Sequence, residues 1–115
     1  MKQNLIVDKS FEFALKIVEL YKFLVTEKKE YVLSKHLVRS GTSVGANIRE
    51  AVVSQSKKEF IAKLNISLKE IHETQYWLLL LMKSDYITDQ QALQNETEEL
   101  IKILTSIIRT SNENS

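Results

Sequence analysis

The sequence predicts an all-α protein, an antiparallel four-helix bundle with up-down-up-down topology. Proline is absent from the 115 residues and glycine occurs twice, whereas a sandwich or barrel needs frequent turn residues. Hydrophobic residues make up 43 % of the chain and recur mostly at steps of three and four, as they do along the buried face of a helix. Short polar stretches separate four such segments, which favours neighbouring helices that run in opposite directions.

The first helix is expected over residues 8–26. Asp8 or Ser10 is placed to cap it by accepting a hydrogen bond from a free amide of the first turn. The apolar face that follows is wider than a coiled-coil seam needs, which indicates contact with more than one neighbour. Its members are Phe11, Ala14, Leu15, Ile17, Val18, Tyr21 and Leu24. A charged turn at 27–30 ends the helix.

The second helix is expected over residues 32–54, and it contains both glycines. Gly41 and Gly45 lie four apart on one face, and each costs about 1 kcal/mol of helix stability relative to alanine. What a glycine permits in return is the close approach of a neighbouring backbone. The predicted buried seam of this helix consists of Ser34, Leu37, Gly41, Val44, Ile48 and Ala51.

The third helix is expected over residues 57–84. Ser56 and Glu59 have the spacing of a capping box, in which the serine oxygen accepts the amide three residues on. The three-and-four spacing then continues for about six turns at roughly 3.6 residues per turn. The buried face is predicted to contain Ile61, Leu64, Leu68, Ile71, Gln75, Leu78 and Met82.

The fourth helix is expected over residues 89–110, opened by a second capping signature at 88–91. Its apolar face is predicted to contain Leu93, Leu100, Leu104 and Ile107, and the polar tail 111–115 is expected to fray. No linker or internal repeat divides the chain, so residues 1–115 are expected to form one domain.

The composition excludes several classes of protein. There is no cysteine, and therefore no disulfide, thiolate zinc site or cysteine nucleophile. The longest apolar run, residues 76–82, is far shorter than the roughly 20 residues of a membrane span. The N-terminus lacks the apolar core of a signal peptide. We therefore expect a cytoplasmic protein that does not associate with membranes.

Catalytic and metal sites are not predicted. A di-metal bundle site needs glutamate three residues before histidine on two helices, and neither His36 nor His72 has one. Ser40 lies four residues after His36, but no acid is placed to orient that histidine. Gly41 and Gly45 are not followed by the Lys-Ser/Thr of a phosphate loop. We predict no catalytic residue, no metal ligand and no cofactor.

A polar stripe follows one side of the second helix. A solvated helix face would tolerate such residues, but the stripe borders the glycine seam and carries directional hydrogen-bonding groups. We hypothesise that it packs against another subunit or lines an assembly channel. The stripe consists of His36, Ser40, Ser43, Asn47, Glu50 and Ser54, with Arg39 beside it. The candidate residues for an oligomer interface or for helix packing are Ser40, Gly41, Ser43, Gly45, Asn47 and Glu50.

The net charge of +1 hides an asymmetry along the chain. Residues 28–63 hold eight Lys or Arg against three acids, a balance of +5, and residues 84–115 have a balance of −4. Ordinary solvated helix faces explain this as well as a polyanion-binding surface does. Because no RNA-recognition or helix-turn-helix pattern is present, any binding of RNA or DNA is expected to go through phosphates. The candidate contacts are Arg39, Arg49, Lys57 and Lys58.

Three segments in order resemble one family. Residues 39–51, RSGTSVGANIREA, resemble the signature of the small bacterial four-helix bundle proteins, also called 23S ribosomal RNA intervening-sequence proteins. Residues 56–60, SKKEF, and 69–78, KEIHETQYWL, are similar to two further motifs of that family. The likeness covers nearly the whole chain. It extends to the accessory proteins of diversity-generating retroelements, which form pentameric barrels and bind nucleic acid and a reverse transcriptase.

The resemblance implies a ring-like homo-oligomer, a homopentamer, with no known enzymatic activity. A ring would multiply the charge of the basic segment and so strengthen binding to a polyanion. We therefore predict a non-enzymatic, homopentameric bundle protein of uncharacterised role that binds RNA or DNA through its basic surface. The alternative is a protein-binding scaffold or accessory subunit that does not bind nucleic acid.

Overall fold

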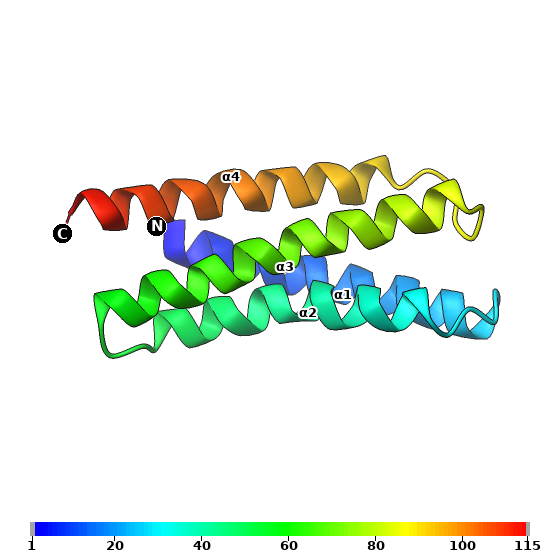
Figure 1. Ribbon diagram of the computed structural model, residues 1–115, viewed down its shortest axis with the longest axis horizontal. Coiled ribbons are helices and arrows are strands. Elements are labelled where there is room, and N and C mark those ends of the chain that lie inside the picture. Colours follow the sequence, from blue (N-terminus) through cyan, green and yellow to red (C-terminus); the bar gives the residue numbers. More distant parts are fainter. Residues whose placement is uncertain (1, 115) are drawn as a thin grey trace.

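The computed structural model describes residues 2–114, which form four α-helices (Figure 1). The helices are α1 (Lys2–Thr26), α2 (Leu33–Val52), α3 (Lys57–Lys83) and α4 (Gln91–Glu113). No strand occurs in this part of the chain. The predicted all-α class with four helices is confirmed. The helices run along the long dimension of the molecule, which measures 48 × 22 × 19 Å.

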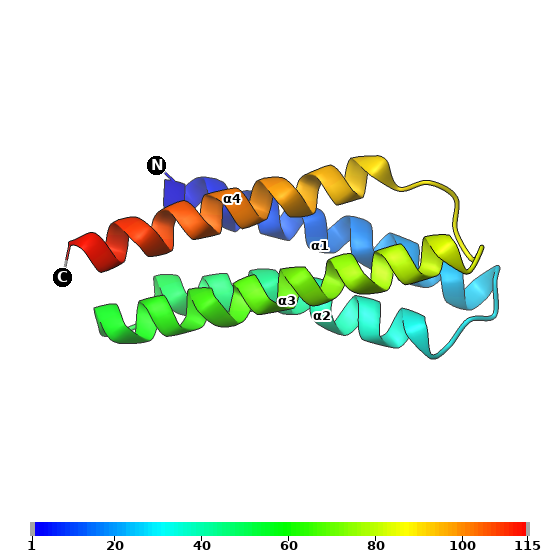
Figure 2. The same ribbon diagram turned by 45° about the horizontal axis from the view of Figure 1, so that its top comes forward.

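Each helix packs against two neighbours, so the four helices lie at the corners of a square. α1 contacts α2 and α4, and α3 likewise contacts α2 and α4. The chain doubles back at each connection, and both termini lie at the same end (Figures 1 and 2). Apolar side chains from all four helices fill the middle, as expected for a bundle. The largest of them are Ile6, Phe13, Ile17, Leu24, Leu37, Ile48, Leu64, Ile71, Leu78, Leu81, Leu100 and Leu104.

The start of α1 differs from the prediction. The helix begins at Lys2, and the two expected capping residues, Asp8 and Ser10, lie inside it. Ser10 is buried, and its hydroxyl donates to the Val7 carbonyl at 3.1 Å. The predicted cap is wrong because the buried stripe begins earlier, at Ile6. Burial of Ile6 favours a helix that starts before it more strongly than a capping hydrogen bond favours a start at Asp8 or Ser10.

The wide apolar face predicted for α1 is divided between the interior and the surface. Ile17 and Leu24 are fully buried, as predicted, and so is Phe13, which the prediction left out. Phe11 and Leu15 instead are 48 % and 47 % exposed. The outer side of α1 therefore carries large apolar side chains that its own chain does not cover.

The bounds of α2 are narrower than the predicted 32–54, but its seam is confirmed. Six positions follow steps of three and four, and every one is buried: Ser34, Leu37, Gly41, Val44, Ile48 and Ala51. These residues face the other helices because their spacing keeps them on one side of α2.

The N-terminus of α2 is capped by Glu30, which the sequence analysis placed in a charged turn. Its buried carboxylate accepts hydrogen bonds from the backbone amides of Val32, Leu33 and Ser34, at 3.2, 3.0 and 2.7 Å. Burial raises the pKa of Glu30, but the three amide bonds outweigh burial, so the pKa lies below its ordinary value. Amides that the first turn of a helix leaves free are thus satisfied by one side chain.

The serine half of the capping box predicted for α3 is confirmed, and the cap predicted for α4 is wrong. Ser56 Oγ accepts the Glu59 amide at 3.0 Å, and α3 ends one residue before the predicted bound. α4 begins at Gln91 rather than 89, with no side-chain hydrogen bond at its N-cap, Gln90. In the connection between α3 and α4, Ile87 is buried against the bundle. α4 also continues through the tail to Glu113, because neither glycine nor proline interrupts it.

Candidate functional site

The two glycines of α2 face α1 at different separations. A Cβ at Gly41 would lie 2.8 Å from Ile17 Cγ2 and 3.0 Å from Ile17 Cγ1, closer than nonbonded carbons approach. A Cβ at Gly45 would meet Ser10 Oγ at 3.4 Å, an ordinary contact. Gly41 is therefore required for the close approach of α1, whereas Gly45 has room for a methyl group. Both lie in a packing contact within the chain.

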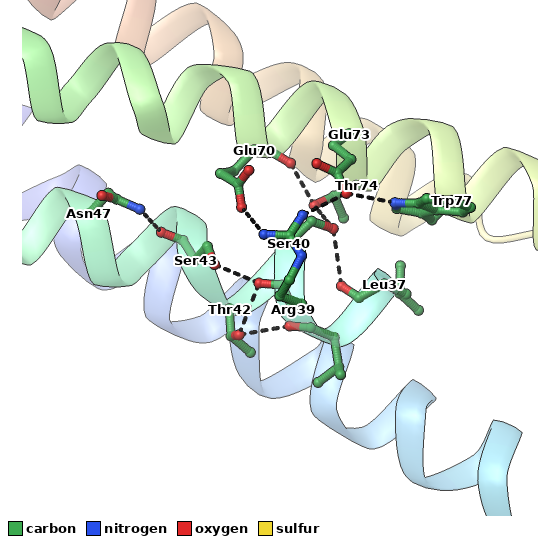
Figure 3. Close-up of polar contacts among 11 residues, drawn as sticks. Leu37, Arg39, Ser40, Thr42, Ser43, Asn47, Glu70, Glu73, Thr74 and Trp77 are labelled. Atoms are coloured by element: carbon green, nitrogen blue, oxygen red, sulfur yellow. Dashed lines mark hydrogen bonds and ion pairs between the residues drawn. The ribbon is translucent and has the colours of Figure 1, made fainter. Parts of the chain in front are cut away.

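Ser40 lies on the opposite side of the α2 seam, in the contact with α3. Its buried hydroxyl is 3.0 Å from Thr74 Oγ1 and 3.2 Å from the Leu37 carbonyl (Figure 3). Nearby, the buried Ser67 donates from α3 to the Val44 carbonyl of α2 at 2.8 Å. These small hydroxyl residues let α2 and α3 approach closely while their polar atoms stay hydrogen-bonded.

Arg39 spans from α2 to two carboxylates of α3. Its Nη1 lies 2.9 Å from Glu70 Oε2, and its Nη2 lies 2.6 Å from Glu73 Oε2 (Figure 3). The hydrogen bond to Glu73 raises the pKa of Arg39, burial lowers it, and the contact with Glu70 raises it. The pKa of Arg39 therefore lies above its ordinary value. The hydrogen bond from Trp77 and then that from Arg39 lower the pKa of Glu73. Although its side chain is 51 % exposed, Arg39 is thus already paired within the chain.

Trp77 completes this polar cluster. Its Nε1 donates to Glu73 Oε2 at 2.9 Å, and its ring stacks on His36 with centroids 4.6 Å apart and planes 17° apart. Tyr76 meets Trp77 edge-on, with centroids 5.0 Å apart. The network from Arg39 through Glu73 therefore fixes the Trp77 ring, and the Trp77 ring supports Tyr76. The stack on His36 joins α3 to α2, so the spacing within one helix does not reveal it.

The remaining polar stripe residues of α2 also bond within the chain. Ser43 donates to the Arg39 carbonyl at 2.6 Å, and Asn47 donates to the Ser43 carbonyl at 2.8 Å (Figure 3). Glu50 pairs with Lys63 of α3 at 2.8 Å. The polar stripe therefore has its partners on α2 and α3, and a role for it at a subunit interface stays a prediction.

The other three basic candidates remain without ion pairs. In the described part of the chain, no carboxylate pairs with Arg49, Lys57 or Lys58, and all three are exposed. The Arg49 guanidinium lies 5.4 Å from the centroid of the Phe11 ring. Lys57 and Lys58 open α3 at the α2–α3 turn. The structure thus separates Arg39, which joins two helices, from the three cations that face outward.

An apolar groove runs between the outer sides of α1 and α2. It has a volume of about 340 Å³, and among the described residues Arg49 is the only charged one that lines it. We call it the α1/α2 groove; its lining consists of Phe11, Ala14, Leu15, Val18, Thr42, Gly45, Ala46 and Arg49. The sequence signal for this groove was the excess width of the apolar face of the first helix. The width of that face predicts more than one neighbour but does not specify which part of it stays exposed, so the groove could not be located from the sequence.

Residues 2–114 contain no candidate for a metal site or for a membrane-spanning helix. No three His, Cys, Asp or Glu side chains there come together in a way that could hold a metal ion. None of the four helices combines the length and the apolar character that a bilayer crossing requires.

The pattern of the 23S rRNA-intervening sequence proteins matches residues 2–106. The chain belongs to this family. It is also similar to the crystal structure of a protein with unknown function from the S23 ribosomal protein family of Bacteroides thetaiotaomicron. The two sequences are 58 % identical, the match covers 95 % of this chain and 99 % of that chain, and the TM-score is 0.92. No curated protein matches the chain.

Two of the segments that resemble motifs of the 23S rRNA-intervening sequence proteins contribute to the contact between α2 and α3. Residues 39–51 lie on α2 and residues 69–78 on α3, and the beginning of the first segment meets the second across the α2–α3 contact. Arg39, Ser40, Glu73 and Thr74 all belong to these two segments and bond across that contact. The motifs that reveal the family therefore encode a helix contact.

Proposed function

We propose that this protein is a non-enzymatic, homo-oligomeric module, an antiparallel bundle whose copies associate through the α1/α2 groove. The observation that supports this proposal is the exposure of Phe11 and Leu15 beside one another on an apolar groove. Full burial of a phenylalanine or leucine side chain is worth about 1.5–3 kcal/mol. About half of each is still exposed, so each can contribute about 1 kcal/mol per copy to association.

The number of copies that we propose, five in a ring, comes from the family resemblance. The chain mass is 13.3 kDa, so size-exclusion chromatography with light scattering should give about five times that mass. A protein that stays at the monomer mass at micromolar concentration would contradict self-association. Another multiple of the chain mass would contradict the pentamer alone.

A charged substitution in the groove tests its role. Leu15→Glu should reduce the measured mass toward that of the monomer, because association would lose the apolar contact of Leu15 and would have to remove water from the new carboxylate. Tyr31→Glu is the matched control, since Tyr31 is 58 % exposed and lies in the α1–α2 connection away from the groove. Equal effects of both substitutions would argue against the groove. Far-UV circular dichroism should show the same helix content in all three proteins.

A second candidate function is binding of RNA or DNA at the α2–α3 turn. The observation that favours it is that Lys57 and Lys58 are adjacent, exposed and without ion pairs in the described chain. Because Arg39 is held by two carboxylates and Arg49 lines the groove, these two lysines are the best remaining phosphate contacts. A ring would bring several copies of the pair to one polyanion.

Fluorescence anisotropy with a labelled single-stranded RNA and a DNA duplex tests this candidate. Lys57→Gln with Lys58→Gln should weaken binding and reduce the slope of log affinity against log salt by about 0.7–0.9 per lost phosphate contact. Lys28→Gln with Lys29→Gln removes the same charge from the α1–α2 connection and should leave that slope unchanged. No binding at low salt would exclude this function and leave the protein-binding scaffold as the alternative.

A further inference from the structure

A hollow lies at the end of the bundle opposite the two termini, where the α1–α2 and α3–α4 connections come together (Figures 1 and 2). Its volume is about 500 Å³, within the roughly 300–1,000 Å³ that are typical of small-molecule sites. We call it the loop-end pocket. It is lined by Leu20 and Phe23 of α1, Lys28 of the first connection, and residues 85–88 and Gln90 of the second.

The apolar part of the loop-end pocket is only partly covered by the chain. Phe23 and Tyr86 are 40 % and 37 % exposed, and they come from different elements, one from α1 and one from the α3–α4 connection. Next to Tyr86, Ile87 is buried and anchors that connection to the bundle. An apolar group that covered both rings would remove their exposed carbon from water, which is a main source of affinity for small ligands.

Two opposite charges border the same pocket from different connections. Lys28 and Asp85 are exposed, and in the described chain neither forms an ion pair. The Lys28 ammonium lies 5.8 Å from the centroid of the Phe23 ring, close enough for a cation–π contact. That contact holds the ammonium beside the apolar part of the pocket. Both charges are therefore free to pair with a ligand.

The backbone conformation at Asp85 is one that glycine adopts more readily. Its φ is +67°, in the left-handed region, and the Tyr86 amide closes the turn by donating to the Leu81 carbonyl at 3.0 Å. Side chains other than glycine raise the energy of this conformation. The turn itself would be more stable with glycine, so the turn does not explain the carboxylate at this position.

The other polar side chains of the pocket are not engaged within the molecule. Thr88 and Gln90 line it, and in the described chain no hydrogen bond engages their side chains or the Tyr86 hydroxyl. The polar stripe of α2 differs, because Ser43 and Asn47 bond within the chain. An apolar surface bordered by a few unengaged polar groups has the composition of a ligand site.

We propose that the loop-end pocket binds a small zwitterion with an apolar body, which is the chemistry of a free apolar amino acid or a short apolar peptide. The carboxylate of the ligand lies beside Lys28, its ammonium beside Asp85, and its apolar part against Phe23 and Tyr86. Asp85 would repel a simple anion and Lys28 a simple cation, so a ligand with both charges matches the pocket better than either. The proposal does not depend on self-association, because the pocket and the α1/α2 groove share no lining residue.

Saturation-transfer difference NMR on the wild-type protein tests the proposal. The probes are phenylalanine and the dipeptide leucyl-phenylalanine, each compared with its N-acetylated form and its C-terminal amide. At least one zwitterion should bind with a dissociation constant of about 1 mM or lower, and both of its blocked forms should bind about tenfold more weakly. The tighter of the two zwitterions identifies the length of ligand that fits. No transfer to either zwitterion at about 10 mM, or blocked forms that bind equally well, would overturn the proposal.

Two variants assign the charges. In Lys28→Gln the affinity for the zwitterion should fall by about tenfold, and its C-terminal amide should bind at least as well, while N-acetylation still weakens binding. In Asp85→Asn the N-acetylated form should instead match the zwitterion. Both residues are exposed and asparagine tolerates a positive φ, so both variants should fold, which circular dichroism verifies.

Matched controls remove the same charges from the same two connections. Lys29→Gln and Asp89→Asn alter residues that do not line the loop-end pocket, and they should leave the affinity for the zwitterion unchanged. Controls that weaken binding as much as Lys28→Gln and Asp85→Asn would show a general charge effect and would overturn the proposed site.

Discussion

Replacing Gly41 by alanine would place a methyl group in the contact between α2 and α1. The new Cβ would lie 2.8 and 3.0 Å from two carbons of Ile17, where about 3.5–4.0 Å is the favourable distance. Ile17 is fully buried and β-branched, and in a helix such a side chain has essentially one rotamer, so it has no room to rotate away. Overpacking of this kind costs about 1–3 kcal/mol. The helix propensity of alanine returns about 1 kcal/mol. We expect Gly41→Ala to lower the free energy of unfolding by up to about 2 kcal/mol.

Gly45→Ala is the matched control, with the same substitution one turn along the same helix. Its nearest neighbour is Ser10 Oγ at 3.4 Å, so the gain in helix propensity should appear as a stabilisation of up to about 1 kcal/mol. Urea unfolding followed by circular dichroism measures both, at one protein concentration because assembly would change the apparent stability. In an Ile17→Ala background, Gly41→Ala should become neutral or stabilising. A Gly41→Ala variant as stable as Gly45→Ala would refute the close approach of α1 and α2 at this residue.

Three further predictions use the same unfolding measurement. Ser56→Ala should lower the free energy of unfolding by about 1 kcal/mol, because the Glu59 amide loses its cap. Ser84→Ala is its control, since it removes a serine hydroxyl that bonds to a carbonyl at the other end of α3 and leaves the N-terminal cap intact. The pKa of Glu30 is lower in the folded than in the unfolded protein, so its carboxylate stabilises the fold fully above the ordinary value of 4.5, and this stabilisation is lost as pH falls through the folded pKa. Glu30→Gln should therefore be less stable than wild type at neutral pH and lose less stability on acidification; an unchanged pH profile would contradict the cap. Arg39→Ala should cost less than about 1 kcal/mol, since the ion pairs are half exposed, and should leave the oligomer mass unchanged; a fall in mass would place Arg39 at a subunit interface.

The sequence determines the buried seam of α2 well because that helix has one dominant apolar stripe. In α1 two stripes share the three-and-four spacing, one through Phe13 and Ile17 and one through Phe11 and Leu15. Nothing within α1 decides which stripe turns inward. Packing against α2 selects the stripe that contains Ile17, because Gly41 leaves the space that Ile17 occupies. Information of this kind belongs to a pair of helices and cannot be obtained from the period of either one.

The same reasoning applies to the polar residues of the candidate site. Arg39 meets Glu70 and Glu73, which lie 31 and 34 residues further along the chain. That contact depends on the register between two helices, which the spacing within each helix does not specify. Glu30 was missed for another reason. The usual capping residues are Ser, Thr, Asp and Asn, and a glutamate within a charged turn resembles a solvated side chain.

Trp77 gives this protein an internal optical probe. It is the only tryptophan in the chain, and it lies where α3 meets the His36 side of α2. Its ring stacks on His36 of α2, so its fluorescence emission depends on the contact between α2 and α3. Separation of α2 from α3 should shift the emission toward that of an indole in water, even while circular dichroism still records four helices. Unlabelled protein can therefore distinguish the opening of this helix pair from the loss of helix elsewhere.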